Sequence, residues 1–316
     1  MHARPVERLE LDRCASSSAE LRERRDVLPG LTRPLHIVVP DAGSRRKSGR
    51  WMPHVLSRDL PRNSFFRISE DVYVEAPYLC FALLASPLPH PLACMLGMEL
   101  CGGYSSLALH AMAHRTEPGK GYLERPPLTS VAQIGRYCDA LELGRRSQAR
   151  RACAQIAARA RSPRESILHL LAHMPAERGG YGLGGYELNC RIPVPEGIGR
   201  LLHVNTLVAD AYWSDWGVAL DYDGENYHAN DAQRSYDNIR RTILRRLGID
   251  VITVDKRQMM DMSVLDGVMQ IVSDAVGGPP IRQDAKSRNA RLELRSQLLA
   301  PDIDLYRVHA TQRSAK

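Results

Sequence analysis

The segment from Leu207 to His228, LVADAYWSDWGVALDYDGENYH, constrains the fold of this chain more than any other stretch. Ser214 to Gly217 is typical of a turn, and runs rich in Val, Leu, Ala and Tyr flank it with an approximate period of two, so a β-hairpin is predicted. In a hairpin symmetrical about that turn, Asp210 lies opposite Asp221. Asp223 then shares the face of Asp221, because side chains alternate along a strand.

Three carboxylates on one small patch of sheet need a compensating positive charge. Directly opposed residues have Cβ atoms about 5 Å apart, and like charges at that distance are destabilising. The pattern therefore indicates a hard divalent cation held by oxygen ligands. Two plainer interpretations remain open: Asp223-Gly224 is also an ordinary turn pair, and a register slip of one residue would make Asp210 an unpaired edge residue.

Further motifs around the hairpin follow a regular order. Ser162-Pro163-Arg164-Glu165 precedes it, Asp221-Tyr222-Asp223-Gly224 and His228 lie on and after its second strand, and Arg240 and Arg241 follow on a predicted helix. In this order the span 162–276 resembles the very-short-patch-repair-endonuclease-like proteins of the PD-(D/E)xK nuclease superfamily. The resemblance implies an α/β (α+β) fold, namely a restriction-endonuclease-like mixed sheet flanked by helices, and a metal-dependent DNA endonuclease that hydrolyses phosphodiester bonds.

On this interpretation the acidic residues hold the metal and basic residues hold DNA. Asp210 and Asp221 would bind Mg²⁺ or Mn²⁺, Asp223 would be a further metal ligand or orient the water, and Glu165 would position a metal-bound water. His228 would assist proton transfer or contact phosphate. Arg240 and Arg241 would neutralise the DNA backbone. Glu165 also fits a capping box that begins with Ser162, and the two roles are compatible.

Two departures from the family pattern favour a second hypothesis. Asp221 stands where the family usually carries Glu, and Asp223 replaces the Lys of the wider superfamily. The middle region, 34–160, more loosely resembles abortive-infection-type antitoxin proteins. The alternative is therefore a non-catalytic DNA-binding regulator with an inactive nuclease fold and an unidentified toxin or other protein partner.

A run of arginines forms a second candidate DNA contact. Seven of them lie between residues 145 and 164 without an intervening acid, and like charges on a helix repel unless an anion or acid lies near. Four are predicted to bind DNA: Arg145, Arg146, Arg150 and Arg151.

Composition adds broad limits. The 316 residues allow more than one domain, and the net charge of +7 favours a polyanionic partner. Seven cysteines show no metal-binding spacing and are expected to be mostly buried free thiols in a cytoplasmic protein without a membrane span. The expected organisation is an N-terminal helical segment, 1–33; a smaller mixed β and helical domain for DNA or partner binding, 34–160; the endonuclease-like domain, 161–278; and a basic tail with one helix, 279–316.

The expected elements follow from hydrophobic periodicity. The predicted strands are 34–40, 65–76, 186–194 and 251–254, beside the hairpin. The predicted helices are 19–27, 78–85, 92–101, 130–160 with a break near Gly144, 231–247, 262–276 and 288–299.

Overall fold

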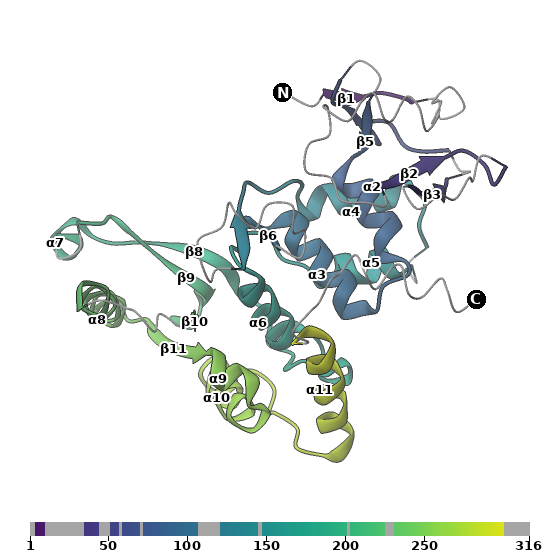
Figure 1. Ribbon diagram of the computed structural model, residues 1–316. Coiled ribbons are helices and arrows are strands. Elements are labelled where there is room, and N and C mark those ends of the chain that lie inside the picture. The colour runs from purple at the N-terminus through teal and green to yellow at the C-terminus, as the bar shows by residue number, and fades with distance from the viewer. Residues whose placement is uncertain are drawn as a thin grey trace.

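The computed structural model describes most of the chain. The described residues are 4–9, 35–43, 51–56, 59–69, 72–106, 121–144, 147–200, 203–224 and 231–299. The predicted helix 19–27 and the predicted DNA contacts Arg145 and Arg146 lie outside them, as does His228. Within them the fold is mixed α/β, with several sheets flanked by helices (Figure 1).

A four-stranded mixed sheet lies at the centre of the C-terminal half. Its spatial order is β11 (Asp250–Asp255), β10 (Val218–Asp223), β9 (Thr206–Trp213) and β8 (Glu187–Pro193). β8, β9 and β10 are antiparallel neighbours, and β11 is parallel to β10. A parallel pair needs a crossover, which here contains α8 (Asp231–Arg246). In Figure 1, β8 and β9 extend as a long hairpin that ends at α7 (Glu196–Gly199).

The predicted hairpin register is confirmed. Val218 pairs with Trp213 and Leu220 with Ala211, so the next residues along, Asp221 and Asp210, lie opposite one another. Gly217 ends the turn with φ of 62°, a left-handed conformation that glycine adopts without strain. The strand prediction 186–194 and the helix predictions 231–247 and 262–276 are also confirmed, within one or two residues at each end.

Helices cover both faces of the sheet. Val218 and Leu220 belong to the main apolar cluster, which also includes residues of α6 (Pro163–His173) and α10 (Met262–Ala275). Ala219 points the other way, into a smaller cluster with Ile243 and Leu244 of α8. The sheet is thus buried on two sides.

A helical layer precedes the sheet and shares its core. The main cluster extends from Met98 of α3 through Leu170 of α6 to Leu294 of α11, so these three helices share one core. The helices of this part are α2 (Pro77–Ala85), α3 (His90–Cys101), α4 (Val131–Ala140), α5 (Gln148–Cys153) and the 3-10 helix η4 (Ala176–Arg178). The remaining helices are α9 (Lys256–Met260) and α11 (Ala285–Leu298).

Three small sheets complete the described structure. Their strands are β1 (Arg4–Val6), β4 (Phe65–Arg67) and β5 (Tyr73–Glu75); β2 (Leu35–Val39) and β3 (Trp51–Val55); and β6 (Tyr104–Ser106) and β7 (Tyr122–Glu124). The single strand predicted over 65–76 is wrong: Ile68 donates its amide to the carbonyl of Val72 at 2.9 Å, and this turn divides the segment into β4 and β5. The 130–160 helix breaks as predicted but ends at Cys153.

Two expectations about composition are tested by the described residues. The six cysteines among them are free thiols, and Cys94, Cys101 and Cys138 are buried. None of the described helices is both long and apolar enough to cross a membrane.

A buried ionic network fastens α11 to the rest of the fold. Asp266 of α10 pairs with Arg291 of α11 at 3.1 Å, and both side chains are under 10% exposed. The hydroxyl of Tyr181 donates to the same carboxylate at 2.7 Å. Because a buried charge without a partner is costly, this network fixes the position of α11.

Asp266→Asn keeps the shape of the side chain but removes the charge opposite Arg291. We expect it to lower the free energy of unfolding by about 3–5 kcal/mol, as measured by urea denaturation, because a buried guanidinium loses its counter-charge. Glu196→Gln is the matched control: it breaks the exposed pair with Arg200 and should change stability by at most about 0.5 kcal/mol. Equal effects of the two substitutions would contradict the importance of the buried network.

Candidate functional site

The carboxylates of Asp210 and Asp221 each accept a main-chain amide of the opposite strand of the hairpin. The backbone amide of Asp210 donates to Oδ1 of Asp221 at 3.0 Å. In return, the amide of Tyr222 donates to Oδ2 of Asp210 at 2.8 Å. Two carboxylates thus take hydrogen bonds that main-chain carbonyls would accept in a regular ladder, and both acids are held where β9 and β10 separate.

Arg240 of α8 forms an ion pair with Asp221. Its Nη1 lies 2.8 Å from Oδ2 of Asp221, and the two side chains are only 18% and 11% exposed. Its Nη2 donates to the carbonyl of Val208 at 2.5 Å. Two groups of the protein therefore hold the guanidinium that was predicted to contact the DNA backbone.

Glu165 approaches the same region from the start of α6. The hydroxyl of Ser162 accepts the amide of Glu165 at 3.1 Å, so the predicted N-cap is confirmed. The other half of the predicted capping box does not form, because the Glu165 carboxylate accepts the amide of Arg161 in place of the amide of Ser162. The Glu165 carboxylate accepts the amide of Arg161 at 2.8 Å and the side-chain amide of Asn189 at 2.6 Å. Its negative charge is one of the causes that raise the pKa of Asp210.

Asn189, which sequence reasoning missed, marks a change in the direction of the sheet. Its φ is 46°, a left-handed value that is uncommon inside a strand. Leu188 packs in the main cluster while Ile192, four residues on and so of the same strand parity, packs in the smaller one. β9 changes side in the same way at Asp210, which lies between Ala209 in one cluster and Ala211 in the other. Because of this twist, charged groups on both faces of the sheet act on Asp210. One face is covered by α6 and the other face by α8.

The surroundings of Asp210 raise its pKa to about 7 from an ordinary value of 3.8. Burial is the largest cause, followed by the negative charges of Glu165 and Asp221. The amide of Tyr222 and the charge of Arg240 oppose the shift. A carboxyl whose pKa is raised by two neighbouring carboxylates lies where a cation would be stabilised.

The other predicted site residues that the structure describes are Asp223, Arg241, Arg150 and Arg151. Asp223 is exposed at the end of β10, where its Cα partner is Asp255 of β11. Arg241 is exposed on α8. Arg150 pairs with Asp139 of α4, and Arg151 donates to Gln148 at 2.8 Å. The expectation that the arginine run lacks acidic partners is therefore wrong for Arg150, whose acid comes from the preceding helix, and for Arg159, which pairs with Glu187 at 3.1 Å.

The donor set suits a hard cation in its chemistry, since Glu165, Asp210 and Asp221 offer only carboxylate oxygens. Among the residues that the structure describes, no group of three or more His, Cys, Asp and Glu side chains is arranged to hold a metal ion. The charge of Asp221 is balanced by Arg240 instead.

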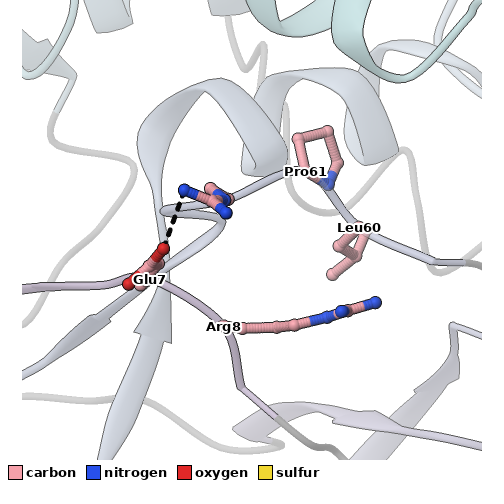
Figure 2. Close-up of a pocket in the computed structure, with 5 residues that line it drawn as sticks. Glu7, Arg8, Leu60 and Pro61 are labelled. Atoms are coloured by element: carbon pink, nitrogen blue, oxygen red, sulfur yellow. Dashed lines mark ion pairs between the residues drawn. The ribbon is translucent and has the colours of Figure 1, made fainter.

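A separate hollow lies beside β1. Figure 2 shows Glu7, Arg8, Leu60 and Pro61 around it, and Arg62 completes the lining. Its ion pair joins Arg62 and Glu7 at 2.8 Å, but both side chains are more than 70% exposed. An exposed pair of this kind is weak and orients a ligand poorly, so the acidic site is the stronger candidate.

Comparisons of the chain with family models, with curated proteins and with solved structures found no match.

The raised pKa of Asp210 predicts a pH dependence of stability. The folded protein binds more protons than the unfolded chain between pH 3.8 and about 7, so Asp210 lowers the free energy of unfolding as the pH rises through that range. Asp210→Asn removes this penalty, while its side-chain oxygen can still accept the amide of Tyr222. Its melting temperature should therefore exceed that of the wild type clearly at about pH 8 and less at about pH 5.

Differential scanning calorimetry at the two pH values measures this difference. Asp215→Asn, on the exposed turn, is the control and should shift the melting temperature little at either pH. A shift for Asp210→Asn that is the same at both pH values would show that Asp210 has an ordinary pKa.

Proposed function

We propose that this chain is a Mg²⁺- or Mn²⁺-dependent endonuclease that acts on DNA, with a restriction-endonuclease-like domain in its C-terminal half. The observation that carries the proposal is the pair of opposed acids, Asp210 and Asp221, beside the charge of Glu165. The arrangement of the surrounding elements supports it: a helix with an acid at its start, an antiparallel hairpin with acids, then a helix and a parallel strand.

The roles of the residues follow from their positions. Asp210 and Asp221 would hold the metal, and Glu165 would orient a water at the same place. When bound, such an ion polarises a phosphodiester and lowers the pKa of water. Asp223, which is exposed at the end of the same strand, would orient a water or a group of the substrate.

DNA would lie along the exposed basic side of α8. Arg241 and Arg245, four residues apart, share one face of this helix, and both are exposed. Such side chains can contact successive phosphates, and each contact releases counterions.

A second candidate function is a DNA-binding regulator that does not cut. The ion pair between Arg240 and Asp221 favours it, because an arginine already supplies the cation that the acids need. The two candidates share the DNA contact and differ in whether a metal replaces that ion pair.

Asp210→Asn should abolish nicking of supercoiled plasmid DNA in Mn²⁺ or Mg²⁺, because one of the two opposed acids loses its charge. DNA affinity should be unchanged or higher, since a negative charge near phosphate has been removed. Asp215→Asn is the control and should nick at the wild-type rate, and EDTA should stop both. If purified Asp210→Asn nicks DNA at the wild-type rate, Asp210 is not part of the catalytic site. If the wild-type protein binds DNA but never nicks it, the regulator is favoured.

Replacing Arg241 and Arg245 together by Gln should weaken DNA binding and reduce its salt dependence. The slope of log affinity against log salt should fall by up to about 0.9 for each phosphate that the variant no longer neutralises. Fluorescence anisotropy with a labelled duplex over a series of salt concentrations measures the slope. An unchanged slope would show that this face of α8 is only solvated.

A further inference from the structure

We propose that Arg240 competes with the divalent cation for Asp221 and so sets the metal affinity of the acidic site. This inference rests on the metal site of the proposed function, but it concerns binding alone and not cleavage. It assigns Arg240 the role of an internal counterion in place of the DNA contact expected from the sequence.

The contacts of Arg240 fix its charge at the site. Its guanidinium is held from two directions, by Asp221 at 2.8 Å and by the carbonyl of Val208 at 2.5 Å. Its side chain is 18% exposed, so solvent screens the pair less than it screens a surface pair. Three other arginines of α8, in contrast, are exposed: Arg241, Arg245 and Arg246.

Both oxygens of Asp221 are already engaged. Oδ1 accepts the amide of Asp210 and Oδ2 accepts Arg240. A cation that binds Asp221 must therefore either displace the guanidinium or bind beside it against like-charge repulsion. Metal affinity is reduced in both cases, so removal of the guanidinium charge should increase it.

The balance of charges points in the same direction. Glu165 and Asp221 both act on Asp210 as negative charges, while Arg240 acts on it as a positive charge. Without Arg240 the acids lose this partner, and a divalent ion becomes the group that offsets their repulsion.

Mn²⁺ binding to the full-length protein without DNA tests the proposal, with the free ion followed by electron paramagnetic resonance. Arg240→Gln should lower the Mn²⁺ dissociation constant by about tenfold or more, because a nearby positive charge is removed. Arg240→Lys keeps the charge and should remain within about twofold of the wild type. Arg246→Gln is the matched control, since it removes the same charge from an exposed position of the same helix and should leave the affinity unchanged.

A second neutral variant, Arg240→Met, keeps the apolar stem and allows the same comparison if the glutamine variant does not fold, as judged by circular dichroism. Tighter Mn²⁺ binding by the neutral variants alone supports the competition. Wild-type binding that is equal to or tighter than that of the neutral variants overturns it and leaves the proposed metal site intact. No binding by any of the proteins at millimolar Mn²⁺ overturns both. If the wild type never nicks DNA but the neutral variants bind Mn²⁺ more tightly, the proposed endonuclease activity is overturned and the competition between Arg240 and the cation is supported.

Discussion

The acidic site depends on two hydrogen bonds across the hairpin, which the carboxylates of Asp221 and Asp210 accept from the amides of Asp210 and Tyr222. Each strand offers a carboxylate to a main-chain amide of the other, at 3.0 and 2.8 Å, so the two side chains are fixed by the hairpin itself. The same bonds bring two negative charges together across a strand pair, which is unfavourable by itself. The neighbouring elements are arranged around this charge: α8 provides Arg240, and the helix cap of α6 provides a third acid.

The twist at Asn189 explains how one aspartate reaches both faces of the sheet. A residue with left-handed φ opposite Asp210 turns the β8–β9 pair, so that side chains of one parity pack first on one cluster and then on the other. Asp210 lies at this change, and the charges of Glu165 of α6 and Arg240 of α8 both act on its pKa. Local backbone geometry therefore determines the electrostatics of the site.

The hairpin and its register could be predicted from the sequence, because a turn and a period of two leave one symmetrical pairing of Asp210 with Asp221. The cap at Ser162 was predictable for the same kind of local reason. The partner of Arg240 was not, since it depends on how α8 crosses the sheet, and spacing along the chain does not encode that. Arg150 was misjudged because its acid, Asp139, belongs to another helix. Asn189 left a usable signal, since Asn is depleted in strands and stands inside a predicted one.

The central claim is that Asp210 shares its surroundings with two other carboxylates. Carbon-13 NMR of the Asp210 side-chain carboxyl, assigned by comparison with Asp210→Asn, measures its titration directly. We expect a midpoint near pH 7, about three pH units above the ordinary value for an aspartate. A midpoint near the ordinary value of 3.8 would contradict the convergence of charge at this site.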